Sequence, residues 1–394
     1  MAALDLNPFP LVQMRPIANG RNEWVALSLD VRANARAGAA LLPETADLLA
    51  AIAPLDCVLL LDTPAQVTPA LLAQLPPQRV VLAVDAGALA LDGAARQLDA
   101  LQEQGYRILL DGALPEGVAR PAMLRGVALD CGATLPTPTP TPAPGSLVAL
   151  FGPHLAYNIG DVHRLRACVQ AGFDWFSGDY PLLPCADGVE EGPSRRRLLA
   201  LLALLARDAD SRELEQLLKQ DTVLSYHLLK LVNSAAFAVS TQITSFAQAI
   251  ALLGRRQMQR WLQLLLYARV EAEGPRNPLL PLAALRAAQL EMLCKTDGGE
   301  RDEQDLAFMT GAFSLLEPLL GMHMAQIVGD LRLPQYVEDA LLRREGLLGA
   351  RLRLVEAGQV PGLDALALAG VDPASWWRSQ LHAFHWAIQV GRNV

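Results

Sequence analysis

Short apolar runs, each about one strand long, recur through the first half of the chain and constrain its fold most. Amphipathic segments such as residues 64–74 and 94–103 lie between several of them. Runs of this length that alternate with helical segments predict βα units and a parallel sheet. We therefore expect an α/β domain whose strands cover residues 24–29, 57–61, 80–84, 107–110, 126–129, 146–151 and 173–176.

Aspartates stand where several of these runs end, at Asp62, Asp85, Asp111 and Asp130. The carboxyl ends of parallel strands are where α/β folds place their ligand sites. Aspartate is also a common turn and N-cap residue, and this is the simpler interpretation of each one taken alone.

A proline-rich segment, residues 134–145, alternates proline with small residues. It excludes a helix or central strand and predicts polyproline II. An interdomain linker is one interpretation. Because an apolar run resumes at residue 146, we favour a shortened crossover within one domain, and a barrel that is incomplete or distorted.

The second half is helical after a polar boundary at residues 187–193. Asp210 and Glu213 predict a capping box, and Ser245 predicts a helix start with a stop at Gly254. An all-α bundle follows, so we predict domains at residues 1–187 and 188–394. Its later helices are expected at residues 279–294, 302–319, 324–330, 334–344 and 373–390.

The composition excludes several function classes. Lys and Arg total 33 and Asp and Glu 41, giving a net charge of −8, which argues against nucleic-acid or polybasic membrane binding. The five cysteines show no CxxC spacing, so a zinc site or disulfide framework is not expected and a reducing compartment is. Without a secretory leader or a long apolar run, we predict a cytoplasmic protein with no membrane insertion.

The segment 214–267 resembles the HDOD domain, an all-helical, non-catalytic relative of metal-dependent HD phosphohydrolases. The resemblance lies in Asp221, in Asn233-Ser234-Ala235 and in the stretch from Ile243 to Gly254, and continues at residues 307–321 and 340–349. No histidine of the chain is followed by aspartate, so no metal is expected in this half. His227, His382 and His385 are interpreted as packed or polar helix residues.

The first half is similar to the EAL domain, the (β/α) barrel of cyclic di-GMP phosphodiesterases. The similar segments are GYRILLDG at residues 105–112, GVALD at 126–130 and GFDWFSGDYPLLP at 172–184. The resemblance implies a degenerate, shortened TIM-like barrel followed by an HDOD bundle, the EAL–HDOD arrangement of bacterial signalling proteins.

The resemblance also assigns the family's catalytic positions. The first-strand glutamate falls at Ser28, the asparagine near Asp62, the Asp-Asp pair at Asp111 and Gly112, and the Lys-x-Asp strand at Ala128 and Asp130. A later acidic stretch falls at residues 150–154, which hold no acid. Because such acids hold paired divalent ions, we predict vestigial positions, no catalytic residue, no metal or cofactor, and no enzyme activity.

We therefore predict a non-catalytic signalling scaffold whose partners are other signalling proteins, such as a regulator, a kinase or a cyclic di-GMP enzyme. Its candidate interaction surface comprises Asn233, Ser234, Phe237, Trp376 and Trp377.

The alternative is a cyclic di-GMP-binding effector without hydrolysis. Asp111 and Asp130 would then line the site, and arginines such as Arg15 would meet phosphate. An active phosphodiesterase is the third and least favoured reading.

Overall fold

The computed structural model describes residues 9–32, 40–118, 121, 124–132, 152–183, 200–201, 203–204, 209–219, 246–267, 276–329, 331 and 333–393. The chain forms two compact units: Met1–Pro181 with Gly358–Val360, and Leu182–Ala357 with Pro361–Val394. The domain boundary that the sequence predicts at residue 187 lies outside the described residues and stays a proposal.

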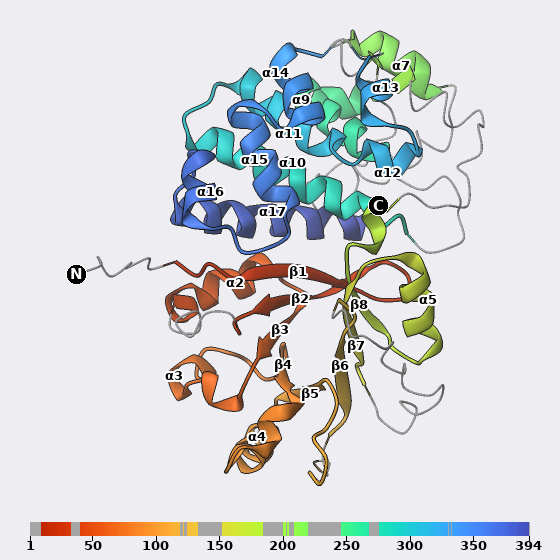
Figure 1. Cartoon of the computed structure of the whole chain (residues 1–394). Helices are drawn as coiled ribbons and strands as arrows, with labels where there is room; N and C mark the ends of the chain where they lie inside the picture. The colour runs from red at the N-terminus through yellow and green to blue at the C-terminus, as the bar shows by residue number, and fades with distance from the viewer. Residues whose placement is uncertain are drawn as a thin grey trace. The chain divides into compact units, whose positions relative to one another are not determined.

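The first unit is built on a closed eight-stranded barrel, whose strands neighbour one another in chain order (Figure 1). β1 runs antiparallel to β2 and β8, and the remaining neighbours are parallel. The predicted fold class, a TIM-like barrel followed by a helical unit, is confirmed. The strands are β1 Gln13–Ala18, β2 Trp24–Asp30, β3 Asp56–Leu61, β4 Val80–Asp85, β5 Arg107–Asp111, β6 Gly126–Asp130, β7 Leu155–Ile159 and β8 Trp175–Gly178.

Two strands differ from the sequence prediction. β1 was not predicted, because QMRPIA mixes polar and apolar residues and contains a proline. β7 covers Leu155–Ile159, whereas the run predicted at 146–151 lies outside the described residues. Since β7 pairs with both β6 and β8, the sheet closes and the expectation of an incomplete barrel is wrong.

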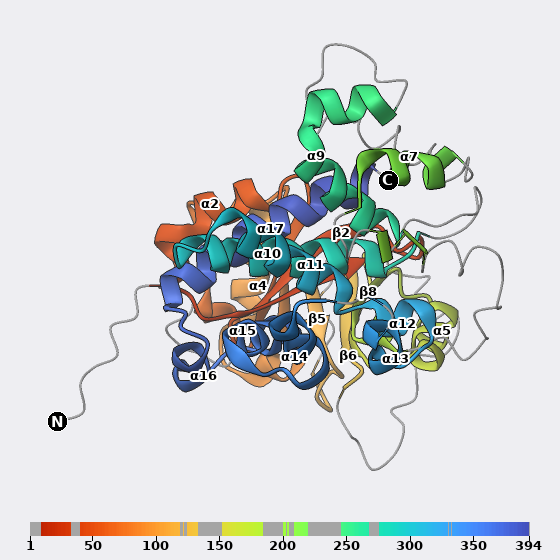
Figure 2. The same cartoon turned by 90° about the horizontal axis from the view of Figure 1, so that it is seen from above.

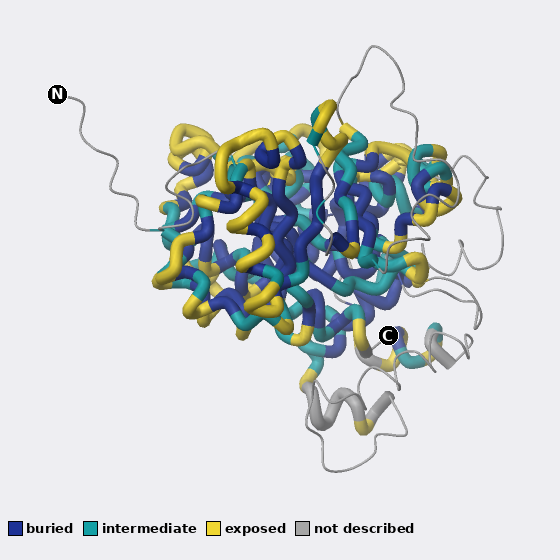
Figure 3. Tube along the Cα trace, turned by 90° about the horizontal axis from the view of Figure 1, so that it is seen from below, coloured by how far each residue is buried: buried dark blue, intermediate teal, exposed yellow. Residues whose placement is uncertain are grey.

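The barrel interior is filled by side chains that alternate along the strands, as the two-residue period of a strand requires. The buried residues, drawn dark blue in Figure 3, run along these strands. The interior cluster comprises Ile17, Ala26, Val58, Leu60, Val81, Ala83, Leu109, Ala128, Leu155 and Tyr157.

Short helices connect the strands. A second buried cluster joins β7 and β8 to α5, through Ala156, Ile159, Cys168 and Phe176. The connecting elements are η1 Leu42–Glu44, α2 Thr45–Ala51, η2 Pro64–Gln66, α3 Pro69–Leu72, η3 Ala86–Ala90, α4 Ala94–Glu103 and α5 Val162–Gln170, with η4 Tyr180–Leu182 after β8.

The described part of the second unit is helical, as predicted. α10 packs on both α17 and α11, and buries residues around most of its circumference. α15 and α16 were not predicted. The helices are α7 Ser211–Lys219, α9 Phe246–Leu265, α10 Leu279–Thr296, α11 Arg301–Phe313, α12 Leu316–Leu320, α13 Met324–Gly329, α14 Gln335–Arg343, α15 Gly346–Glu356, α16 Leu363–Leu368 and α17 Pro373–Asn393.

The predicted stop at Gly254 is a kink rather than an end. Gly254 has φ 76° and ψ 158° inside α9, and the helix resumes after it. Figure 2 shows the change of direction within α9. Among the described helices, none is both long and apolar enough to cross a bilayer.

Candidate functional site

Side chains along a strand alternate between its two faces, so a residue two positions after an inward-facing one points the same way. At the carboxyl ends of several strands this residue is an aspartate, and these aspartates form a ring. Each acid follows an inward-facing residue by two positions: Asp62 follows Leu60, and Asp111 follows Leu109. In the same way, acids stand two positions after Ser28, Ala83 and Ala128. The ring therefore comprises Asp30, Asp62, Asp85, Asp111 and Asp130.

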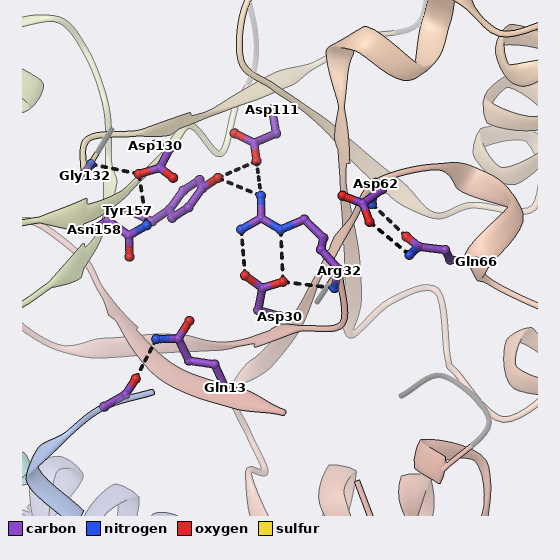
Figure 4. Close-up of polar contacts among 11 residues, drawn as sticks. Gln13, Asp30, Arg32, Asp62, Gln66, Asp111, Asp130, Gly132, Tyr157 and Asn158 are labelled. Carbon is purple, nitrogen blue, oxygen red and sulfur yellow. Dashed lines mark hydrogen bonds and ion pairs between the residues drawn. The ribbon is translucent and has the colours of Figure 1, made fainter. Parts of the chain in front are cut away.

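Arg32 provides a positive charge within this ring (Figure 4). Its Nε and Nη2 donate to the two carboxylate oxygens of Asp30, at 3.0 and 2.7 Å. Its Nη1 donates to Oδ2 of Asp111 and to the hydroxyl of Tyr157, each at 3.1 Å. The bidentate bond and the burial of Asp111, whose side chain is 7% exposed, make this a tightly held cation.

Asp111 and Tyr157 share a short hydrogen bond, in which the phenol donates to Oδ2 of Asp111 at 2.5 Å. Burial raises the pKa of Asp111, although Tyr157 and Arg32 oppose the shift. Burial and the neighbouring Asp111 carboxylate raise the pKa of Tyr157. The hydroxyl therefore remains a protonated donor, held between one carboxylate and one guanidinium.

The other acids of the ring make local hydrogen bonds. Asp85 accepts from the Gly87 backbone N–H at 2.7 Å and caps the turn η3. The side chain of Asp62 accepts from Gln66 at 3.3 Å. These bonds agree with the turn role that the sequence favours for single aspartates.

Asp130 organises the end of β6. Its Oδ1 accepts from the Gly132 backbone N–H at 2.8 Å and from the Asn158 amide at 3.0 Å. Asn158 has φ 54°, a left-handed conformation that asparagine tolerates better than most residues. The amide thus ties the end of β6 to β7.

Arg15 is a second cation at this end of the barrel. It pairs with Ser28 in the β1–β2 register, and its Nη1 lies 3.1 Å from Oδ1 of Asp179. The side chain is 18% exposed, and its Nε is buried without a hydrogen-bond partner. Arg15 therefore keeps a donor that its protein neighbours do not use.

Two predicted positions carry no charge. Ser28 is buried, and its hydroxyl donates to the Arg15 carbonyl at 3.1 Å. Ala128 is buried in the barrel interior. Of the predicted positions, only Asp111 meets Arg32 directly, while Asp62 and Asp130 bond to their own neighbours.

The ring does not fit a metal ion as it stands. In the part of the chain that the structure describes, no three His, Cys, Asp or Glu side chains group closely enough to hold one. The Arg32 guanidinium instead supplies positive charge to Asp30 and Asp111.

The candidate interaction surface is not supported where the structure describes it. Trp376 and Trp377 are 3% and 0% exposed, because α17 packs along α10 and buries this part of the helix. Asn233, Ser234 and Phe237 lie outside the described residues.

The arginines after Gly254 are engaged within the protein and do not form a free basic face. Arg256 and Arg260 both pair with Asp305, at 2.5 and 3.0 Å. Arg260 also bonds Glu291.

Residues 196–311 match the model of the HDOD domain. The HDOD resemblance found in the sequence is therefore confirmed for residues 196–311.

Two curated relatives match larger parts of the chain. The protein of Vibrio cholerae serotype O1 named cyclic di-GMP phosphodiesterase CdgJ is 34% identical over 191 residues, 48% of this chain and 44% of the relative. The Bacillus subtilis (strain 168) protein YuxH is 26% identical over 238 residues, 59% of this chain and 58% of its own. The chain thus spans about half the length of the curated relatives it matches.

Two solved structures are similar at low identity. A calcium and cyclic di-GMP complex of Klebsiella pneumoniae BlrP1 gives a TM-score of 0.34 at 17% identity, covering 45% of this chain and 56% of that one. A cyclic di-GMP complex of the phosphodiesterase PaMucR gives 0.33 at 15%, covering 42% and 92%. The barrel assignment itself rests on the strand topology of this chain.

These relationships correct one prediction. The expectation that the chain is not an enzyme is contradicted, because a protein 34% identical over 191 residues is named a cyclic di-GMP phosphodiesterase. Ser28 and Ala128 nonetheless occupy the positions that the resemblance assigns to the family's glutamate and lysine. The scaffold role predicted as the main function gains no support from these relatives.

Sequence reasoning missed Asp30, Arg32, Tyr157 and Asn158. Asp30 is the last residue of the strand WVALSLD, two positions after Ser28. It therefore fits the pattern of a strand that ends in an aspartate, and this pattern could have identified it. Tyr157 and Asn158 were missed because β7 was placed too early. Arg32 was missed because two of its three partners, Asp111 and Tyr157, are distant in sequence.

Proposed function

We propose that this chain recognises cyclic di-GMP at the carboxyl end of its barrel, as part of a signalling protein that joins an EAL-like barrel to an HDOD domain. The observation that carries the proposal is the 34% identity to a relative named cyclic di-GMP phosphodiesterase. The location follows the general rule that barrels of this class bind ligands at the carboxyl ends of their strands.

Two guanidinium groups suit the ligand's phosphodiesters. The Arg15 side chain is 18% exposed and pairs with the exposed carboxylate of Asp179, and Arg32 lies among the strand-end acids. Guanidinium groups form charge-assisted, often bidentate bonds with phosphate. A phosphate that engages Arg32 would compete with Asp111, whose raised pKa reflects a carboxylate that is costly to keep charged.

Hydrolysis of the same ligand is the second candidate function, and the name of the Vibrio cholerae relative favours it. Five acids and two arginines lie at this end of the barrel, and the excess of carboxylates repels an anionic nucleotide. Magnesium is therefore included in the assay as a counter-ion for the nucleotide.

The test is a calorimetric titration of the full chain with cyclic di-GMP in the presence of Mg²⁺, followed by chromatography of the nucleotide. Saturable binding supports the proposal. A linear or cleaved product would establish hydrolysis in addition. Absence of binding heat, together with no thermal stabilisation by excess nucleotide, would refute it, because a ligand that binds the folded state must stabilise it.

A further inference from the structure

Two cysteines that play no part in the proposed site lie in contact at the outer face of the barrel. Cys131 directly follows β6, and Cys168 lies in α5. Their sulfur atoms are 3.7 Å apart, although 37 residues separate them in sequence. A disulfide requires roughly 2.05 Å, so the two side chains together must close about 1.7 Å.

The two thiols differ in their burial and in the direction in which their pKa is shifted. Cys168 is fully buried in the cluster between α5 and the sheet, whereas Cys131 is half-buried at its rim. The contact with Cys131 lowers the pKa of Cys168, with Arg164 adding to the effect and burial opposing it. The reciprocal contact raises the pKa of Cys131.

We propose that Cys131 and Cys168 form a reversible disulfide when the protein meets a peroxide. Peroxide reaches Cys131, the more exposed sulfur: the Cys168 sulfur in contact with it accepts its proton, the Cys131 sulfur attacks one oxygen of hydrogen peroxide, the O–O bond breaks, the proton passes to the departing hydroxide, and sulfenic acid and water form. The Cys168 sulfur then attacks the sulfenic sulfur, the S–S bond forms, and the hydroxyl leaves as a second water with the remaining proton. Two thiols are oxidised by two electrons and one peroxide is reduced.

The modification lies beside the strand-end acids. The backbone N–H of Cys131 donates to the Tyr157 carbonyl at 2.8 Å, and its neighbours Asp130 and Gly132 bond each other at 2.8 Å. A crosslink to α5 would fix this end of β6 against the helix. The assignment rests on the thiol geometry alone and stands whether or not the barrel binds a nucleotide.

The test uses the full chain, reduced and desalted, then exposed to a small excess of hydrogen peroxide. Thiols are counted in denaturant before and after, and disulfide-linked peptides are identified by mass spectrometry. The wild-type count should fall from five to three, with one linked pair that contains Cys131 and Cys168, and dithiothreitol should restore it.

Two variants complete the design. Cys131→Ser should lose no thiols under the same exposure, while the control Cys294→Ser, at another half-buried cysteine, should still lose two. The proposal is overturned by an unchanged wild-type count, by a linked peptide that joins other cysteines, or by equal thiol loss in Cys131→Ser. The wild-type peptide map decides the matter even where a variant folds poorly.

Discussion

Replacing Arg32 with methionine should destabilise the barrel by about 2–3 kcal/mol. Removing one partner of a fully buried ion pair costs about 3–5 kcal/mol, and an exposed pair contributes about 0.2–1 kcal/mol. Arg32 lies between these limits, because its side chain is 23% exposed while that of Asp111 is 7% exposed. The variant leaves the Asp111 carboxylate buried with Tyr157 as its remaining side-chain donor.

The assay is thermal and urea unfolding of the full chain. Limited proteolysis, with the cleavage sites mapped to the barrel or to the helical unit, then shows which unit has unfolded. For a unit of this size, about 2–3 kcal/mol corresponds to a fall of roughly 5–10 °C in the barrel transition. The matched control is Arg107→Met, which removes a more exposed pair with Asp56 in the same barrel and should cost less than about 1 kcal/mol.

A loss for Arg32→Met no greater than that for Arg107→Met would refute the reasoning. A second check is Asp111→Asn in the Arg32→Met background. Because the amide carries no charge to desolvate, the double variant should regain part of the lost stability, and strict additivity would contradict the coupling.

Three further outcomes follow. Tyr157→Phe removes the donor to Asp111 and should cost about 1–2 kcal/mol in urea unfolding; an unchanged midpoint would show that water replaces the phenol. Burial lowers the pKa of His382, so the unfolded state binds more protons, and stability should fall as the pH drops through the ordinary histidine value toward the lowered one. His382→Gln should flatten that slope in pH-dependent melting, and an identical slope would exclude His382 as its source. Gly254→Ala places a Cβ at φ 76° with no atom within 4 Å, so backbone strain of about 1–2 kcal/mol should appear in melting curves. Gly329→Ala, where φ is not positive and space is also open, should show no such loss.

The sequence predicted most of the barrel because its strands bury apolar residues on both faces. Val80–Asp85 and Asp56–Leu61 read as continuous apolar runs, which is the pattern of a buried parallel strand. β1 escaped because it is the antiparallel strand and carries Arg15 on the inward face. β7 escaped because Tyr157 and Asn158 interrupt its apolar character.

The candidate site was predictable only in part. The aspartates at strand ends follow a local pattern, so Asp111 and Asp130 could be found from residue order alone. Arg32 could not, because its bonds to Asp111 and Tyr157 depend on barrel closure across 79 and 125 residues. Trp376 and Trp377 were predicted to lie on an interaction surface, but α17 packs along α10 and buries both side chains. The sequence pattern alone does not show whether aromatic residues of such a helix are buried or exposed.

The location of the proposed site is open to a direct test with three substitutions. Wild type, Arg15→Met, Arg32→Met and the control Arg107→Met are each titrated with cyclic di-GMP below their melting temperatures. Loss of one charge-assisted bond to phosphate corresponds to roughly tenfold or more in affinity, whereas a distant arginine should change it by less than about twofold.

The most direct measurement of the central claim is therefore the dissociation constant of cyclic di-GMP across this series. The account predicts saturable binding by the wild type and by Arg107→Met, weakened about tenfold or more in Arg15→Met and in Arg32→Met. Absence of binding by the folded wild type would contradict recognition of this nucleotide. Equal affinity across all four proteins would contradict its placement at the carboxyl end of the barrel.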